Sequence, residues 1–283
     1  MDNLLPRIPL ASWIDQFVDW LVITFGGVFD GITLLLEGIV EGIVSGLGFI
    51  PSIILAFLFG ALAWFISTKR IAVFTLVGLL LIDYLGYWSP MLQMLALVLT
   101  SVAISIVIGI PIGIWSSQND TARKIVTPIL DFMQTMPAFV YLLPAIFFFN
   151  IGVVPGVVAS VIFSMPPTIR LTTLGIRQVP EDLIEATEAF GSTTWQKLVK
   201  VEIPLAMPTI MAGINQSIML ALSMVVIASM VGAPGLGEEV YRAVTQLKTG
   251  VGVEAGLAIV IVAIILDRIT QHAGKKKQGG IVS

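Results

Sequence analysis

The sequence predicts an all-α polytopic membrane protein, and three observations carry that prediction. Hydrophobic residues make up 57% of the chain and charged residues only 12%, and the mean hydropathy is +0.98. Uncharged apolar runs recur along the chain, and one transmembrane helix needs about 20 such residues. Prolines and glycines punctuate these runs, a pattern that membranes tolerate only where neighbouring helices or a cavity satisfy the backbone.

The composition also bounds the chemistry that the chain can perform. Cysteine is absent, and the single histidine, His272, lies in the polar tail. The sequence contains no HExxH motif, no serine–histidine pairing and no carboxylate dyad. We therefore expect no enzyme activity, no catalytic, metal-binding or cofactor-binding residue, and no nucleic-acid partner; the surrounding medium is the lipid bilayer.

The first region, 1–48, is hydrophobic but carries acids at spacings close to whole helical turns. These acids are Asp15, Asp19, Asp30, Glu37 and Glu41. They can share one face of a helix, opposite residues such as Trp13 and Phe17, which predicts an amphipathic helix in the membrane interface. The alternative is a single span that starts near Trp20 and places acids in the membrane at a cost.

Seven spans are predicted after this segment. They lie at 51–68, 71–87, 91–115, 125–149, 153–169, 209–231 and 255–269. Gly109 and Gly113 form a small-xxx-small pair in the third span, which predicts close contact with another helix. The proline and glycine breaks favour a packed bundle with a pathway, and the alternative is ordinary kinks in a structural bundle.

The distribution of basic residues orients these spans. If successive loops between the spans alternate between the two sides of the membrane, 12 of the 15 lysines and arginines fall on one side. The other side holds only Arg7, Arg242 and Lys248. Because cations concentrate on the cytoplasmic side, the first of these sides is predicted to face the cytoplasm. The chain is then a multi-pass protein of the cell membrane with its N-terminus outside, its C-terminus inside and the loop between Arg170 and Met207 in the cytoplasm.

The cytoplasmic loop at 179–207 begins with a predicted short helix. Pro180 suits the first helical position, and the acids Glu181 and Asp182 favour its positive end. Leu183 and Thr187 start an apolar stripe that Phe190 completes. The next residue, a glycine, can adopt the left-handed conformation that ends a helix.

A second short helix is predicted to follow that glycine. Thr193 with Gln196 resembles a capping box, and Trp195 belongs to an apolar face. Pro204 is expected to stop this helix before the next span. Such a helix–glycine–helix elbow with an apolar edge suits docking into a groove on a partner protein, and the alternative is an amphipathic loop without a partner.

The elbow resembles the EAA loop of ABC-importer permeases. The pattern Glu-Ala-x-x-x-x-Gly, nine residues, then apolar-x-apolar-Pro falls on Glu185, Ala186, Gly191, Val201, Ile203 and Pro204. The third position, usually alanine in the family, is Thr187. The resemblance implies that the first helix sits in a cleft of an ATPase subunit, with these coupling residues: Glu185, Ala186, Thr187, Phe190, Gly191 and Pro204.

Three longer stretches, 48–69, 131–171 and 215–238, resemble glycine betaine and proline betaine permeases of the ProW/OpuAB type. The resemblance implies a MetI-like, type I ABC-importer transmembrane domain with a five-helix core and outer scaffold helices. The regions are then 1–48, an amphipathic segment; 49–88, scaffold helices; 89–272, the core with its EAA loop; and 273–283, a basic cytoplasmic tail.

The same resemblance implies an assembly and a solute. A homodimer of permeases would work with two ATPases, which bind the ATP and magnesium, and with an extracellular substrate-binding protein. The solute would be glycine betaine or a related quaternary-ammonium osmoprotectant. Choline and carnitine are the alternatives, and a secondary transporter is less favoured because ionisable residues are nearly absent from the spans.

Polar residues in otherwise apolar spans are the candidates for the solute pathway. They are Gln134 and Thr135 beside Pro137, and Asn215, Gln216 and Ser223 in the sixth span.

Asp131 is an acid inside a core span, and we expect a gate or an interhelical partner; the alternative is pairing with Arg123 or Lys124 at the interface. The segment 232–237 is a predicted turn. By resemblance, this turn, with Gly235, belongs to an external gate or docking surface.

Overall fold

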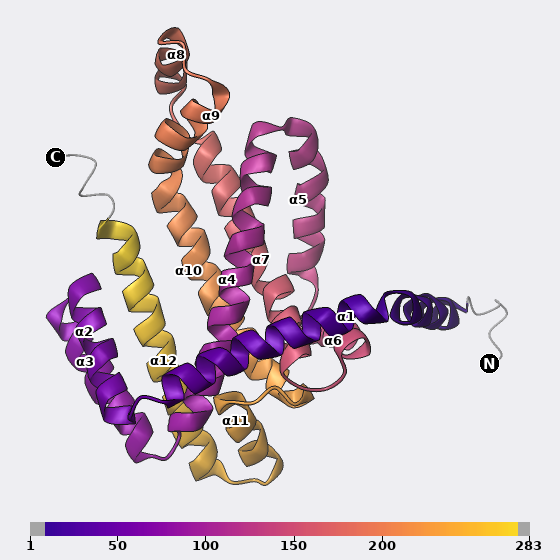
Figure 1. The fold of residues 1–283 in the computed structure, drawn as a ribbon, viewed down its shortest axis with the longest axis vertical. Helices are drawn as coiled ribbons and strands as arrows, with labels where there is room; N and C mark the ends of the chain where they lie inside the picture. The colour runs from indigo at the N-terminus through magenta and orange to yellow at the C-terminus, as the bar shows by residue number, and fades with distance from the viewer. Residues whose placement is uncertain (1–8, 277–283) are drawn as a thin grey trace, which may run out of the picture.

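The computed structural model describes the backbone of residues 9–276 and the side chains of residues 9–272, and every regular element in this part is helical. The longer helices are α1 (Leu10–Gly48), α2 (Ser52–Ile66), α3 (Lys69–Tyr84), α4 (Trp88–Gln118), α5 (Asp120–Thr135), α6 (Leu142–Phe149), α7 (Val153–Arg177), α8 (Glu181–Ala189), α10 (Ile203–Ala228), α11 (Leu236–Thr245) and α12 (Thr249–Lys276). The shorter ones are η1 (Ala138–Tyr141), α9 (Thr194–Lys197), η2 (Leu198–Glu202) and η3 (Ser229–Val231). Figure 1 shows α4, α5, α7, α10 and α12 running along the long axis, with α8 and α9 at one end and α11 at the other.

The centre of the bundle is the packing of α4, α7 and α10. A Cβ atom added at Gly113 would lie 2.6 Å from Thr172 Cβ, and one at Gly109 would lie 3.0 Å from Thr168 Cγ2. These glycines let α4 approach α7 closely, so the contact predicted from their spacing is confirmed. A Cβ at Gly213 of α10 would similarly lie 2.9 Å from a side chain of α7.

Buried hydroxyls reinforce the same three-helix core. Ser105 Oγ lies 3.0 Å from Ser164 Oγ, which links α4 to α7. Thr168 Oγ1 lies 2.7 Å from Ser217 Oγ, which links α7 to α10. Small polar residues are favoured where membrane helices pack, since they allow close approach and can hydrogen-bond across the interface.

The helices α2 and α3 form an antiparallel pair outside this core. A Cβ at Gly78 would lie 2.6 Å from Ile261 Cγ2, so α3 packs directly on α12. Near the end of α3, Ser52 Oγ donates to Asp83 Oδ2 at 2.8 Å. With 15 and 16 residues, α2 and α3 are each about 22–24 Å long, shorter than the hydrocarbon core of about 30 Å.

The predicted span at 125–149 is broken at the proline-containing segment between Thr135 and Ala138. The chain bends by 109° between α5 and the segment formed by η1 and α6. Met136 is extended, with ψ 135°, and Pro137 follows it. A residue before proline is driven out of the helical region, and proline has no N–H to donate, so the helix must end there.

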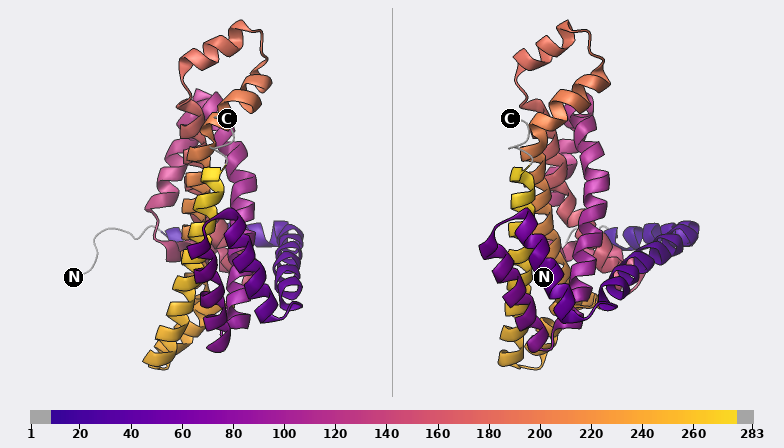
Figure 2. Two further views of the ribbon diagram at one scale, coloured as in Figure 1. Left: turned by 90° about the vertical axis from the view of Figure 1, so that its left-hand side faces the viewer. Right: turned by 60° about the vertical axis from the view of Figure 1, so that its left-hand side comes forward.

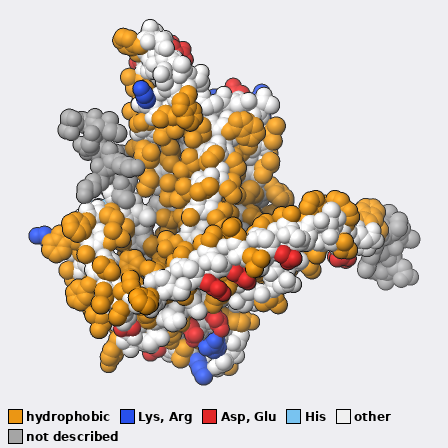
Figure 3. All heavy atoms as spheres, in the orientation of Figure 1, with side chains coloured by type: hydrophobic (Ala, Val, Ile, Leu, Met, Phe, Trp, Pro, Cys, Tyr) orange, Lys and Arg blue, Asp and Glu red, His pale blue; other side chains and the backbone are white. Residues whose placement is uncertain are grey.

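The long helix α1 lies across the bundle instead of along it (Figures 1 and 2). Leu36 and Val40 are buried against the core, and the Phe29 ring stacks 4.9 Å from that of Phe148. The N-terminal half of α1 is largely exposed, and acidic side chains follow its edge on the side of α11 (Figure 3). By length and composition α1 could also cross a membrane, so its interfacial position stays a prediction.

Candidate functional site

The end of α8 shows how one glycine sets the bend of the elbow. Gly191 has φ +75°, in the left-handed region. Its N–H donates to Glu188 O at 2.8 Å, and the Ser192 N–H donates to Thr187 O at 3.3 Å. These two bonds form a Schellman motif, which satisfies the last carbonyls of the helix. The predicted glycine-ended first helix is therefore present.

The second helix of the elbow begins at the cap that the sequence indicates, whereas the first begins one residue later than predicted. Pro180 lies one residue before α8, and Glu181 and Asp182 occupy its first turn. At α9 the Thr193 Oγ1 accepts from the Gln196 N–H at 3.3 Å, while Gln196 Oε1 accepts from the Thr193 N–H at 2.9 Å. This reciprocal pair is a capping box, so the predicted second helix start is confirmed.

The elbow projects beyond the bundle (Figures 1 and 2), and it carries exposed apolar side chains. Phe190 is 90% exposed and Trp195 is 71% exposed. An ion pair between Lys197 Nζ and Glu188 Oε1, at 2.6 Å, ties α9 back to α8. An ordered projection with large exposed aromatic groups has the character of a docking surface.

The predicted coupling residues occupy different parts of this elbow. Glu185 and Ala186 are exposed on α8, beside Phe190 and Gly191 at the bend. Thr187 is half-buried, and its hydroxyl donates to Leu183 O at 2.6 Å. Thr187 therefore supports the helix, whereas Glu185 and Ala186 present their side chains to the outside.

Pro204 does not stop the second helix, so that prediction is wrong. The chain from Thr194 to Val231 is one continuous helical rod, with Pro204 in the first turn of α10. The π-helical turn η2 lies directly before it. Its wider hydrogen-bonding pattern leaves room for a residue without an N–H, because the local ladder is already interrupted.

A buried carboxylate joins this rod to α4 at the base of the elbow. Glu202, in η2, is 3% exposed, and its Oε2 accepts from Gln118 Nε2 at 2.5 Å. Leu198 is buried one turn earlier, in a small apolar cluster with Ile176 of α7 and Ala206 of α10. A buried carboxylate needs such a partner, since burying it unpaired is costly. The elbow is thereby anchored to the bundle and does not hang from flexible linkers.

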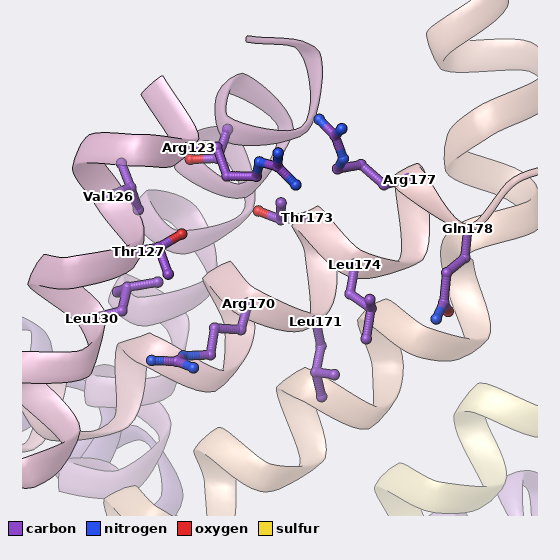
Figure 4. Close-up of a pocket in the computed structure, with 11 residues that line it drawn as sticks. Arg123, Val126, Thr127, Leu130, Arg170, Leu171, Thr173, Leu174, Arg177 and Gln178 are labelled. Atoms are coloured by element: carbon purple, nitrogen blue, oxygen red, sulfur yellow. The ribbon is translucent and has the colours of Figure 1, made fainter. Parts of the chain in front are cut away.

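A basic cavity of about 470 Å³ lies between the neighbouring ends of α4, α5 and α7. Arg123 and Arg177 lie at one side of it and Arg170 at the other (Figure 4). Arg177 Nη1 pairs with Asp120 Oδ1 at 2.9 Å, and Arg170 pairs with Asp131. Two ion pairs thus fasten α5 to α7.

The partner of Asp131 differs from the one expected at the interface. Asp131 pairs with Arg170, whereas Arg123 pairs with Asp120 at 3.3 Å. Asp131 is therefore an interhelical partner, which was the first of the two predicted roles. The alternative, pairing with Arg123 or Lys124, is wrong, because these residues lie seven or eight positions away on the same helix, about 10–12 Å along its axis.

The pathway candidates in α10 separate into two groups. Asn215 Nδ2 donates to Asp267 Oδ1 at 3.0 Å, and Asn215 Oδ1 accepts from Thr270 Oγ1 at 2.6 Å. Asn215 therefore joins α10 to α12. Gln216 and Ser223, by contrast, lie on the one exposed stripe of α10. That stripe consists of Leu205, Pro208, Ala212, Gln216, Met219 and Ser223.

The other candidates lie at breaks in the bundle. Gln134 and Thr135 are exposed at the end of α5, just before the 109° bend, and the Thr135 hydroxyl donates to Phe132 O at 2.9 Å. Gly235 has φ +127°, and a Cβ there would lie 3.0 Å from Met94 N. Gly235 therefore lets the loop press against α4, and α11 begins at the next residue.

Sequence reasoning missed three contributors to this site. Glu202, Arg170 and Lys197 were read only as part of a polar or basic loop. Their roles depend on partners 84, 39 and 9 residues away, respectively. An acid between apolar residues, as in Val201-Glu202-Ile203, was the one local signal that pointed to burial with a partner.

These features define the membrane-spanning subunit of a transporter, with a glycine-packed bundle, a broken helix and a projecting elbow. The chain belongs to the family of binding-protein-dependent transport system inner membrane components, whose family model matches residues 105–278. It is 78% identical to the glycine betaine transport system permease protein OpuAB of Bacillus subtilis, over 98% of both chains. It is 56% identical to the glycine betaine/carnitine transport permease protein GbuB of Listeria monocytogenes, over 98% of this chain and 99% of that one.

Solved structures show the same architecture. An inward-facing structure of the MetNI methionine ABC transporter has a TM-score of 0.60 and 23% sequence identity, and the match covers 68% of this chain and 94% of that chain. At this identity the likeness establishes the fold alone. The predicted MetI-like transmembrane domain of an ABC transporter is therefore confirmed.

Proposed function

We propose that this chain is the permease subunit of an ATP-driven importer for glycine betaine or a related quaternary-ammonium osmoprotectant. The single observation that carries the proposal is the 78% identity to a glycine betaine permease over 98% of both chains. The elbow of α8 and α9 supports coupling to a partner ATPase, because its exposed Phe190 and Trp195 suit a groove on a protein.

The assembly follows from the surfaces that the bundle leaves open. An ATPase on the elbow requires the elbow end to be cytoplasmic, which agrees with the basic residues at that end. The opposite end carries α11, where Arg242 pairs with Glu238 at 2.7 Å, and offers a polar surface to an extracellular binding protein. The exposed stripe of α10 carries the amide of Gln216, which lipid would not satisfy, so in this proposal a second permease copy or the pathway covers it.

In this proposal the chain performs no bond chemistry. ATP and magnesium act in the partner ATPases, whose closure moves the elbows. The continuous rod from Thr194 to Val231 and the hydrogen bond between Glu202 and Gln118 carry that displacement into the bundle. The bundle then alternates between inward-facing and outward-facing arrangements, a rigid-body transition between two packed states.

The proposal is tested by uptake of radiolabelled glycine betaine into proteoliposomes that hold this chain with its ATPase and binding protein. We expect glycine betaine to accumulate only when ATP is present on the side of the membrane that bears the ATPase. Accumulation should stop when the binding protein is left out. Unlabelled carnitine and choline, added as competitors, decide between the related solutes. Accumulation driven by a proton or sodium gradient without ATP would show a secondary transporter and overturn the assignment.

Gln216 and its neighbour Asn215 provide a matched test of the pathway. Gln216→Leu is expected to raise the KM for solute uptake severalfold, because it removes a polar group from the exposed stripe of α10. Asn215→Leu should leave that KM unchanged. It should lower the free energy of unfolding by about 1–2 kcal/mol, because it breaks the hydrogen bonds to α12.

Measurement of KM and of the thermal unfolding midpoint for both variants separates the two roles. Ser223→Ala, on the same stripe as Gln216, serves as a milder companion variant. A raised KM in Asn215→Leu with normal stability would contradict the division between the two positions.

A further inference from the structure

A second basic cavity lies far from the elbow, where the α2–α3 turn meets the end of α12. Its volume is about 740 Å³, and its walls are Thr68, Lys69, Arg70, Ile71, Arg268 and His272. The packing of α3 on α12 brings these two chain segments together, because the helices run antiparallel and meet at Gly78 and Ile261. Three cations and a histidine thus line a cavity built from two elements.

Two of the three cations in this cavity, Lys69 and Arg70, lack acidic partners among the described residues, and the third has only a distant one. Neither Lys69 nor Arg70 forms an ion pair with any described carboxylate, and Arg268 lies 3.9 Å from the carboxylate of Asp267, which already accepts hydrogen bonds from Asn215 and Gln271. Lys69 and Arg70 also stand in the first turn of α3, the end of a helix at which cations are unfavourable. An anion in the cavity would offset both sources of repulsion.

The position of the cavity relative to the bilayer points to the source of that anion. Because α2 and α3 are shorter than the hydrocarbon core, the turn between them does not rise far above the membrane surface. The helix that leads up to this turn has an apolar surface, since Ile54, Phe57 and Leu58 of α2 are all more than half exposed. Figure 3 shows this hydrophobic surface over α2 and α3 with a basic side chain at its edge.

A tryptophan side chain lies between the basic cavity and the apolar surface of α2. Trp64 is 58% exposed, and the Lys69 Nζ lies 5.7 Å from the centre of its ring. Tryptophan is enriched at the level of lipid headgroups, and lysine and arginine stems extend towards that level. Cations above an exposed tryptophan and an apolar wall match the phosphate, interface and acyl chains of one lipid molecule.

We infer that this cavity binds the headgroup of an anionic phospholipid in the cytoplasmic leaflet, with Lys69, Arg70 and Arg268 around the phosphate. Basic pockets between helices on the cytoplasmic side have the chemistry for such headgroups. The inference rests on the proposed orientation of the chain and does not require the proposed solute. The lipid would fasten the α2–α3 pair to α12 at the membrane surface.

The test uses the fluorescence of Trp64 in nanodiscs of mixed phosphatidylglycerol and phosphatidylcholine. The full chain is reconstituted at one fixed lipid ratio, with brominated acyl chains on either the anionic or the neutral lipid. The difference between the wild type and Trp64→Phe isolates the quenching of Trp64. We expect phosphatidylglycerol to quench at least roughly fivefold more per molecule than phosphatidylcholine, as one basic side chain alone would give.

The variant Lys69→Gln/Arg70→Gln/Arg268→Gln should abolish that preference, so that the two lipids quench Trp64 equally per molecule. Arg268→Gln alone, a change of one exposed side chain, gives a partial loss and serves if the triple variant fails to insert. Arg242→Gln/Lys248→Gln, at the opposite end of the bundle, is the matched control and should keep the full preference.

Two outcomes would overturn the inference. The first is equal quenching by the two lipids in the wild type. The second is loss of the preference when inorganic phosphate is added at an ionic strength matched with sodium chloride, because the cavity would then take free phosphate. Neither outcome depends on transport, so the proposed function stands or falls separately.

Discussion

Gly191→Val is expected to abolish ATP-driven uptake while the chain still inserts into the membrane. Gly191 has φ +75°, and a β-branched residue in the left-handed region costs at least about 1–2 kcal/mol. No atom lies within 4 Å of a Cβ built at this glycine, so the backbone conformation alone is responsible for the effect. The short helix α8 would lose its Schellman end, and the surface bearing Phe190 would no longer be held in place.

Gly191→Asn is the matched control for this prediction. Asparagine adopts the left-handed conformation more readily than other residues with a side chain, and the open space around Gly191 accommodates it. We expect Gly191→Asn to retain most of the uptake and Gly191→Val to retain almost none, at equal amounts of permease in the membrane. Normal uptake by the valine variant would show that the bend of the elbow does not couple the ATPase to the bundle.

The elbow could be predicted from sequence because its structure depends on interactions between residues that are close together in the chain. Gly191 ends α8, and the pair Thr193 and Gln196 starts α9, and each needs only neighbours within a few residues. The contact made by Gly109 and Gly113 was equally readable, because the spacing of two small residues already identifies a helix surface for close approach. The partner helix, α7, was not readable from that spacing.

The failures concern residues whose role is set by distant parts of the chain. Pro204 would normally end a helix, but the π-helical turn before it lets the rod continue. Asn215 stays a pathway candidate, but the local sequence does not show that Asp267, which lies 52 positions later, accepts its hydrogen bond. The interhelical role of Asp131 was predicted, but its partner Arg170 lies 39 positions later on α7 and is not visible in the local pattern.

The arrangement of these contacts suggests how movement at the elbow reaches the stripe on α10. The rod from Thr194 to Val231 carries the proposed docking position, the anchor to α4 and the proposed pathway position in sequence along one helix. Trp195 lies in the elbow, Glu202 at the anchor to α4, and Gln216 on the exposed stripe. The buried hydrogen bond from Gln118 to Glu202 lies between the elbow and the stripe, where it would pass a movement of the rod to α4.

Gly113→Ala is expected to destabilise the bundle by roughly 1–3 kcal/mol or more, because it overpacks the contact between α4 and α7. The added Cβ would lie 2.6 Å from Thr172 Cβ and 2.9 Å from the backbone oxygen of Ile169, closer than real Cβ atoms come. The helices would have to separate, which would also strain the bond that Thr173 Oγ1 donates to Gly113 O at 3.0 Å. A lowered thermal unfolding midpoint of the purified chain in detergent measures the effect.

Alanine substitutions at two other helical glycines serve as comparisons for the unfolding midpoint of Gly113→Ala. A Cβ at Gly109 would lie 3.0 Å from Thr168 Cγ2 and 3.2 Å from Thr168 Cβ, a smaller overlap than at Gly113, so Gly109→Ala should cost less than Gly113→Ala. At Gly256 of α12 nothing lies within 4 Å, so Gly256→Ala should be neutral or stabilising by up to about 1 kcal/mol, because alanine favours the helix more than glycine does. The expected order of midpoints is therefore Gly256→Ala, Gly109→Ala and Gly113→Ala, from highest to lowest. Equal midpoints for all three would mean that α4 and α7 can move apart freely, which contradicts a core held by close backbone approach.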